Sequence, residues 1–406
     1  MPNHSPDDRR DLRDLSIRLI LLLGIVSLCG SLISNGARSV TGPYILLLGG
    51  SAAVVGLVAG FGEFIGYALR SATGAYVDQS RRYWNVAMGG YGLLAVIPLL
   101  AFVHQWEAAA LLIIAERIGK AIRTPARDTI LSHATTAIGR GWGFGVHKAL
   151  DQVGAVIGPL VMAAALAATG GYAPGFLLLG IPLAGVAVIL FFARSSVPRP
   201  GRLEADGGTR VTGDDLPGVM PYATFIFLGM AGFANFPLIS FHLKAQSVIP
   251  DAAIPLYYAS AMMVSVVVAL LIGRVFDRLG THVLLTIPVF SISTVLLAFS
   301  PTPGTALAGS LVWGAGIGIF ETVLRASIAE STAAARRGQV YGVMSAIFGT
   351  AWFVGSAVMG VLYDVSLEHI VAYVVIVEIA ALVAYLWIYR SRIAVKFQEG
   401  IGNLIP

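Results

Sequence analysis

Long apolar segments recur along this chain, and their length constrains its fold more than any other feature. Six of them lie near residues 17–35, 51–77, 84–103, 106–126, 144–169 and 172–193. Six more lie near residues 219–243, 252–276, 283–299, 305–324, 340–362 and 370–388. A helix needs about 20 apolar residues to cross a bilayer core of about 30 Å. The sequence therefore predicts an all-α integral membrane protein with six plus six transmembrane helices in contact with lipid.

Composition argues against a soluble protein. Charged residues make up 12% of the 406 residues, against about 25% in soluble domains, and the mean hydropathy is +0.79. The net charge of +5 is dispersed between apolar segments, so nucleic-acid binding is not predicted. Cys29 is the only cysteine, which excludes an intrachain disulfide. The sequence has no GxxxxGK[ST], HExxH or CxxC motif, so we predict no cofactor, no metal site and no enzymatic activity.

A charged stretch rich in Pro and Gly, residues 194–218, separates the two sets of segments. Such a composition cannot bury a core and predicts a solvated linker. The expected organisation is an N-terminal unit at 1–193 with a polar tail, a cytoplasmic linker at 194–218 and a C-terminal unit at 219–406. No cleavage site follows the first apolar run, so we expect the first helix itself to be the insertion signal.

Basic residues between the segments predict the topology. If the N-terminus is cytoplasmic, nearly all of them fall on the cytoplasmic side, and only Arg38 and Lys244 lie near the other face. The cytoplasmic set is Arg81, Arg82, Arg140, Arg194, Arg199, Arg202, Arg210, Arg278, Arg336, Arg337, Arg390, Arg392 and Lys396. Both termini are therefore predicted to be cytoplasmic. The compact length and the lack of sorting signals favour a bacterial inner membrane.

The two halves of the chain repeat each other at a nearly constant offset. A GxxxD segment at Gly74 returns 199 residues later at Gly273, and Arg127 returns 198 residues later as Arg325. An RGxxxG segment at Arg140 returns 197 residues later at Arg337, with Tyr in place of Phe before its last Gly. Three matches at nearly the same offset predict a duplicated six-helix unit, an arrangement found in transporters built from parallel repeats.

The two GxxxD segments, each with basic residues nearby, resemble the signature motif of the major facilitator superfamily. The second copy is close to the family pattern, whereas the first has Gln79 where Arg is usual and Arg81 where the second Gly is usual. The resemblance covers essentially the whole chain. It implies two pseudo-symmetric six-helix bundles around a central cavity that opens alternately to either side, and a single chain is sufficient for that fold. The motif residues expected to hold the cytoplasmic gate are Gly74, Asp78, Arg81, Arg82, Gly273, Asp277 and Arg278.

Charged residues within the fourth segment are the first candidates for a site. Glu116, Lys120, Arg123 and Arg127 recur at i, i+4, i+7 and i+11, which places them on one helix face. Ionisable groups at bilayer depth are costly, so this face is expected to line the cavity, with Glu116 and Lys120 able to pair. Arg123 and Arg127, together with Arg325, are predicted to hold the inner gate.

Arg117 lies where the superfamily's fourth-helix motif, RxxxG, has an arginine linked to proton transfer in efflux members. The match is partial, since Ala121 stands in place of the glycine. The resemblance therefore implies a proton-linked role for Arg117.

The fifth segment carries a second polar face, formed by His147 and Asp151 with Lys148 beside them. Gly154 and Gly158 continue that face and favour close helix contact, while Pro159 is expected to bend the helix. The sequence GxxxGP resembles a fifth-helix motif seen mainly in antiporters of the superfamily, although the glycine pair usual after it is absent. This resemblance favours export.

Glu63, flanked by Gly60, Gly62 and Gly66 in the second segment, is the first choice for a carboxylate that binds and releases a proton. Asp151 is the alternative. The side chains expected to meet Glu63 or to line the cavity with it are Asn35, Arg38, Glu321 and Arg325. Glu378 has no evident partner and receives no role. His242 and Lys244 are predicted to form a solvated helix end.

These features support three hypotheses. The first is a secondary transporter that exports a small organic compound in exchange for protons. The second is proton-coupled uptake of an anionic solute, such as a carboxylate or an organophosphate, recognised by Lys120 and Arg117. The third is a membrane sensor or scaffold that transports nothing.

Overall fold

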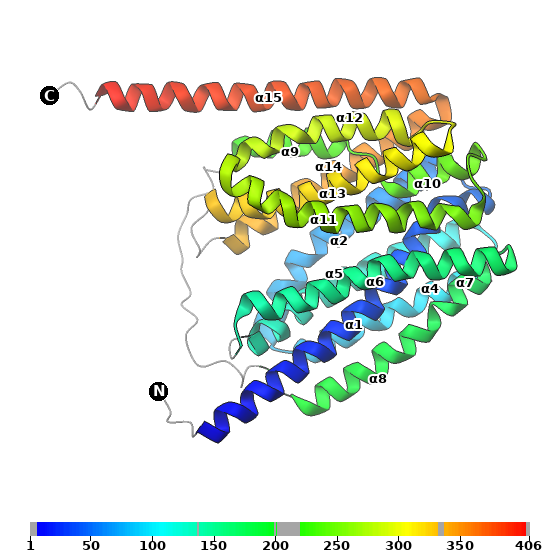
Figure 1. Cartoon of the computed structure of the whole chain (residues 1–406), viewed down its shortest axis with the longest axis vertical. Helices are drawn as coiled ribbons and strands as arrows, with labels where there is room; N and C mark the ends of the chain where they lie inside the picture. The colour runs from blue at the N-terminus through cyan, green and yellow to red at the C-terminus, as the bar shows by residue number, and fades with distance from the viewer. Residues whose placement is uncertain (1–5, 136–137, 199, 201–219, 332–336, 403–406) are drawn as a thin grey trace.

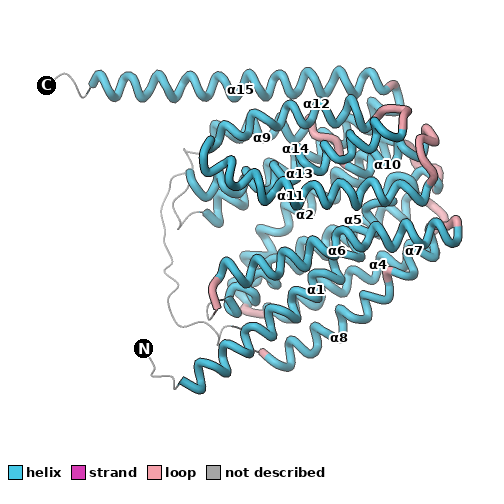
Figure 2. Tube along the Cα trace, viewed as in Figure 1, coloured by secondary structure: helices cyan, strands magenta, loops and turns pink. Residues whose placement is uncertain are grey.

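The computed structural model describes residues 6–135, 138–198, 200, 220–331 and 337–402. Over these residues the chain forms helices joined by short connections, without a β-strand (Figure 2). The helices gather into two bundles, and both ends of the chain lie at the same end of the molecule (Figure 1).

The first bundle contains six crossings, of which the third and the sixth are made of shorter helical pieces. Its α-helices are α1 (Pro6–Leu47), α2 (Ala52–Ser80), α3 (Tyr83–Gly92), α4 (Val96–Leu99), α5 (Trp106–Thr135), α6 (Arg140–Thr169), α7 (Tyr172–Leu178) and α8 (Gly180–Ser196). Two 3₁₀ turns, η1 (Leu93–Ala95) and η2 (Leu100–Phe102), continue the third crossing.

The second bundle repeats this plan. Its α-helices are α9 (Met220–Ala231), α10 (Phe236–Ala245), α11 (Ile254–Leu279), α12 (Thr286–Ala298), α13 (Pro303–Ser331), α14 (Arg337–Val365) and α15 (Leu367–Gly402). The 3₁₀ turns η4 (Asp251–Ala253) and η5 (Gly280–Leu285) precede α11 and α12.

Ten helical segments of the described chain are long and apolar enough to span a membrane, and a shorter apolar helix covers His282–Ala298. The remaining crossing is α5, whose length matches theirs but whose sequence contains Glu116, Arg117, Lys120 and Arg123. The predicted fold class is confirmed: the chain is an all-α, multi-pass membrane protein of six plus six crossings.

The crossing predicted near residues 219–243 is present over Ala223–Ala245, but it is not one continuous helix. The seventh crossing is broken between Ala231 and Phe236, and α10 starts anew with Asn235 as its N-cap. The Asn235 side-chain oxygen accepts a hydrogen bond from the backbone N–H of Leu238 at 2.9 Å. Pro237 follows in the first turn, where its missing N–H costs nothing.

The bundles meet along equivalent helices of the two repeats. The second crossing, α2, packs along the eleventh, α14, and the fifth, α6, packs against the eighth, α11 (Figure 1). Gly60 permits the first contact, because a Cβ at this position would lie only 2.9 Å from the Cα of Phe353. The sequence repeat is therefore also a structural repeat.

The end of the molecule opposite the termini, here called the closed end, is held by polar contacts between the bundles. Asp251 accepts a hydrogen bond from the Tyr172 hydroxyl at 2.7 Å and pairs with Lys244. The Asp364 carboxylate accepts hydrogen bonds from the backbone N–H groups of Ala52 and Ala53, at 3.1 and 3.0 Å.

The predicted solvated helix end at His242 and Lys244 was wrong. His242 is only 1% exposed, and its Nδ1 lies 3.0 Å from the Tyr363 hydroxyl. Packing of α10 between α1 and the second bundle covers this end of the helix, which the sequence of α10 alone does not reveal.

Candidate functional site

A polar cavity of about 210 Å³ lies between the bundles. Its walls come from α1, α2, α5 and α6 on one side and from α11, α13 and α14 on the other. Side-chain exposure rises along the cavity, from 13% at Arg38 to 52% at Lys148, near the start of α6. In this conformation the cavity therefore opens toward the end that carries the termini.

Glu63 lies deep in the cavity between two arginines. Its carboxylate is 2.8 Å from the Arg38 guanidinium and 3.6 Å from that of Arg117. Gly62 makes room for Arg117, since a Cβ there would lie 2.8 Å from Cγ of that arginine. Arg38 also lies over the Trp352 ring, at 5.9 Å from its centroid. Two cations can hold Glu63 ionised despite its burial.

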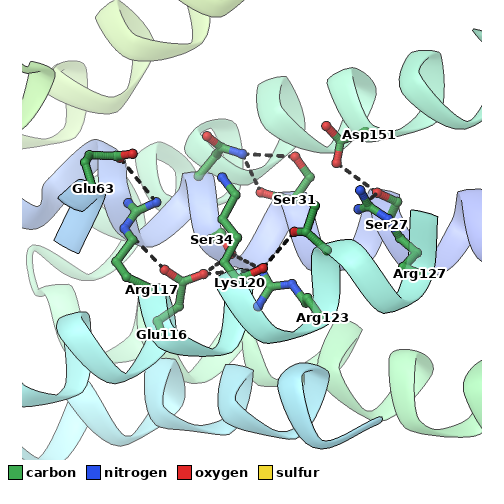
Figure 3. Close-up of polar contacts among 12 residues, drawn as sticks. Ser27, Ser31, Ser34, Glu63, Glu116, Arg117, Lys120, Arg123, Arg127 and Asp151 are labelled. Atoms are coloured by element: carbon green, nitrogen blue, oxygen red, sulfur yellow. Dashed lines mark hydrogen bonds and ion pairs between the residues drawn. The ribbon is translucent and has the colours of Figure 1, made fainter. Parts of the chain in front are cut away.

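Glu116 forms a second ion-pair cluster behind the cavity wall (Figure 3). It is only 3% exposed and accepts a hydrogen bond from the Ser34 hydroxyl at 2.6 Å. Arg123 and Arg117 lie 3.3 and 3.5 Å from its carboxylate. Arg117 thus links Glu116 to Glu63. The expected Glu116–Lys120 pair was wrong, because Glu116 turns toward Ser34 of α1.

Lys120 and Arg70 line the cavity without a carboxylate partner within the part of the chain that the structure describes. Arg70 lies over the ring of Tyr67, at 5.1 Å from its centroid. The charge of these two cations is therefore not neutralised by an ion pair with a described carboxylate.

At the open end of the cavity, Ser27 joins a further ion-pair group. Its hydroxyl donates to Asp151 at 2.9 Å and accepts from Arg127 at 3.2 Å. Asp128 pairs with Arg127 at 2.7 Å, and Lys148 lies 3.6 Å from Asp151. Asp151 is thus partnered by Lys148 and, through Ser27, by an arginine of α5.

The second bundle contributes three aromatic side chains to the cavity and no basic one among the described lining residues. The Tyr258 hydroxyl donates to Asn35 Oδ1 of the first bundle at 2.8 Å, across the cavity. Trp313 and Trp352 line the same wall, and Glu321 is its acidic side chain. An organic solute would therefore meet cations on one side and rings on the other.

Other predicted residues lie away from the cavity. His147 is buried in α6 and does not line it. Gly154 and Gly158 lie against α1, where an added Cβ would collide with the carbonyl oxygens of Leu28 and Leu32. Pro159 follows within α6, which continues as a helix to Thr169. The two glycines allow α6 to pack closely against α1. The side of α6 that lines the cavity carries Lys148 and Asp151.

The predicted gate motifs are exposed in this conformation. Asp78, Arg81, Arg82, Asp277 and Arg278 make no ion pair among the described side chains. Gly74 and Gly273 have open space around them, with no atom closer than 3.9 Å to an added Cβ. Both motifs lie at the open end, and the described part of the chain shows no gate ion pair there. Arg325 falls outside the residues whose side chains are described.

Several residues that line the cavity or join its ion-pair groups were not predicted from the sequence. Ser27, Ser31 and Ser34 recur at i, i+4 and i+7 on α1, a polar stripe that could have been found. Arg70 lies two turns after Glu63 on α2, which the helical period also predicts. Tyr258 and the two tryptophans give no such signal, because aromatic residues are common in any apolar helix.

The sequence profile described as the Major Facilitator Superfamily matches residues 26–305 and 222–403. The chain belongs to this superfamily and is a secondary transporter, not an enzyme, with a small-molecule substrate. An uncharacterised protein of Mycobacterium tuberculosis is 41% identical over 387 residues, 93% of this chain and 94% of that protein. An uncharacterised transporter of the same superfamily from Methanocaldococcus jannaschii is 24% identical over 371 residues, 88% of this chain and 91% of that one.

Solved structures share the fold. The nucleoside transporter NupG superposes with a TM-score of 0.67 at 18% identity, covering 92% of this chain and 98% of that one. A bacterial homologue of the human lysosomal transporter Spinster, in an inward-facing and unoccupied conformation, gives 0.72 at 13% identity, covering 93% and 97%.

Proposed function

We propose that this protein is a proton-coupled transporter of small organic anions, in an inner membrane, with both termini in the cytoplasm and one chain as the working unit. The observation that carries the proposal is the charge of the cavity wall. Three acidic residues line it, against seven cationic ones. The cationic residues are Arg38, Arg70, Arg117, Lys120, Arg123, Arg127 and Lys148.

The ion pairs leave part of this positive charge uncompensated. Glu63 is neutralised by Arg38 and Arg117, and Asp151 by Lys148, whereas Lys120 and Arg70 have no carboxylate partner among the described side chains. A poorly hydrated cavity with excess positive charge attracts anions and repels cations. This favours the anionic solute over a cationic drug.

Glu63 suggests how a proton would be coupled to the anion. Protonation would remove the negative charge from Glu63 and release Arg38 and Arg117, which could then bind a carboxylate or a phosphate. Departure of the anion would favour ionised Glu63 again. Proton and anion would therefore bind together and move in the same direction, as in symport.

The rival hypothesis is export by antiport, which rests on the Gly158–Pro159 motif of α6. In antiport, proton and cargo occupy the site in turn, so a cargo would have to compete with the proton at Glu63. The positive wall around Glu63 favours binding together instead.

Transport assays in liposomes test the proposal. Purified protein would be reconstituted with an internal pH-sensitive dye, and gradients of organic carboxylates, organophosphates and cationic drugs would be imposed. We expect proton movement in the same direction as an anion, lost in Glu63→Gln and kept in Glu107→Gln, an exposed control on α5. Proton movement opposite to a cationic or neutral solute would instead support antiport. The absence of coupling to every solute in the panel would overturn the proposal.

A further inference from the structure

Glu378 on α15 is buried in the second bundle, outside the cavity. Its exposed fraction is 0%, and both carboxyl oxygens lack a hydrogen-bond partner among the described residues. An ionised carboxylate in such a place would lose its hydration without compensation, which is strongly unfavourable. The transport mechanism proposed above does not use this group, so its burial requires a separate explanation.

No charged group faces Glu378 from the helices around it. α15 packs against α9, α12 and α14. α9 and α12 have no charged residue in their sequences, and α14 has only Arg337 and Asp364, at its two ends. The cation that would stabilise an ionised Glu378 is therefore missing.

The polar side chains near Glu378 on α12 and α15 are hydroxyl groups. Ser291 of α12 and Tyr373 of α15 lie near its carboxyl group, and the Ser291 hydroxyl likewise lacks a hydrogen-bond partner among the described residues. His282 bonds through Nδ1 to the Tyr385 hydroxyl at 3.1 Å, two turns farther along α15. These surroundings suit a neutral carboxylic acid.

Glu378 lies directly on the break in the seventh crossing. A Cβ added to Gly232, the first residue after α9, would be 2.9 Å from Cδ of Glu378. The Tyr373 hydroxyl donates to the carbonyl of Ala231 at 3.2 Å. Glu378 and Tyr373 of α15 thus contact Gly232 and Ala231, where the break begins.

On the other side of the break, α10 packs against α1 of the first bundle. A Cβ added to Gly42 of α1 would lie 2.7 Å from the backbone nitrogen of Phe241 and 2.8 Å from Ser240 Oγ. Lys244 at the end of α10 pairs with Asp251, which Tyr172 of the first bundle also contacts. Opening the closed end must separate α10 from α1, and residues 232–235 are the irregular backbone that can absorb this motion.

We propose that Glu378 is a proton-binding site of the second bundle that carries its proton while the closed end is shut and releases it when the break at 232–235 opens. In this step the carboxyl O–H bond breaks and the proton passes to water that enters at the break. The ionised carboxylate is then hydrated by the same water. The site is distinct from Glu63, and its existence does not depend on the identity of the transported solute.

Infrared difference spectroscopy tests proton binding directly. The protein would be titrated with alkali in the Glu63→Gln background, and the carbonyl stretch of protonated carboxyl groups recorded. We expect a titratable band that disappears in Glu378→Gln and persists in Glu368→Gln, an exposed control on the same helix. An unchanged band in Glu378→Gln would overturn the proposal, whatever the transport assays show.

Accessibility of the closed end tests the link to the break. In a Cys29→Ser background, Ser240→Cys would place a thiol at a buried position of α10. We expect thiol labelling to accelerate severalfold as the pH rises, and to be slow at every pH when Glu378→Gln is added. Glu378→Asp, which keeps the acid, should retain the pH dependence with a shifted midpoint. The same pH dependence with and without Glu378→Gln would contradict the proposal.

Discussion

The two bundles share a backbone plan but contribute different chemistry to the cavity between them. The first bundle supplies its cations and two of its acids, held in clusters around Glu63, Glu116 and Asp151. The second supplies Tyr258, Trp313, Trp352 and one acid, Glu321. The repeat therefore preserved the apolar segments that determine the fold, while the few polar positions diverged and the cations of the cavity wall gathered in one bundle.

The same contrast applies to buried acids. Glu116 of the first bundle is surrounded by two arginines and a serine, whereas Glu378 of the second is surrounded by uncharged groups. One position can retain an ionised carboxylate and the other favours a neutral acid. Four substitutions test whether the two bundles differ in this way.

The largest effect is expected for Glu116→Gln in the first bundle. The change leaves Arg117 and Arg123 without their shared carboxylate, and such losses cost about 3–5 kcal/mol. Glu368→Gln in the second bundle, at an exposed position of α15, should cost no more than about 0.5 kcal/mol. Denaturant unfolding in mixed micelles measures both free energies. Equal losses would show that the charge clusters do not distinguish the bundles.

The second-largest effect is expected for Lys120→Gln, which should weaken anion binding. A hydrogen bond to a charged group contributes about 1.5–3 kcal/mol, and about 1.4 kcal/mol corresponds to a tenfold change. We therefore expect the KM for the anion to rise about tenfold or more, with folding unchanged. Arg274→Gln, an exposed control on α11, should leave the KM unaltered. An unaltered KM in Lys120→Gln would remove this lysine from the binding site.

Gly158→Ala tests the contact that fixes α6 to α1. The added methyl group would collide with the carbonyl of Leu32, and overpacking of this kind costs about 1–3 kcal/mol. Gly185→Ala on α8, where no atom lies within 4 Å of the added Cβ, should be neutral or slightly stabilising. Thermal unfolding in detergent compares them, and a neutral Gly158→Ala would mean that α1 and α6 can separate without cost.

The smallest effect is expected for Tyr258→Phe, which removes the hydrogen bond to Asn35 between the bundles. Such a bond contributes about 0.5–1.5 kcal/mol. The loss should shift the equilibrium between open and closed cavities by a few fold while leaving the binding of anions to the first bundle intact. Distance measurements between spin labels on the two bundles would detect the shift. A loss of anion binding itself would place Tyr258 among the binding residues.

Much of the fold was predictable because the length of an apolar segment is a property of the sequence alone. The shared face of Lys120, Arg123 and Arg127 followed from the helical period in the same way. The serines of α1 could also have been predicted, since Ser27, Ser31 and Ser34 form a stripe on one face of the helix. The boundaries predicted for the two domains and the linker remain a prediction, because much of 194–218 lies outside the described residues.

Features that depend on contacts between distant segments were not predictable. The orientation of Glu116 toward Ser34 depends on how α5 packs against α1. Burial of His242 depends on the position of α10 between the bundles, and the environment of Glu378 depends on where α15 crosses the break. The break itself had a local signal, since Asn235 and Pro237 form a helix start within an apolar run.

The number of protons that the protein takes up or releases when it binds an anion tests the proposed coupling at Glu63 most directly. Purified protein in weakly buffered detergent would be mixed with an organic carboxylate or phosphate while the pH of the solution is recorded. We expect proton uptake as the anion displaces Glu63 from Arg38 and Arg117, absent in Glu63→Gln and retained in Glu107→Gln. Proton release, or anion binding without any proton exchange in the wild type, would contradict it.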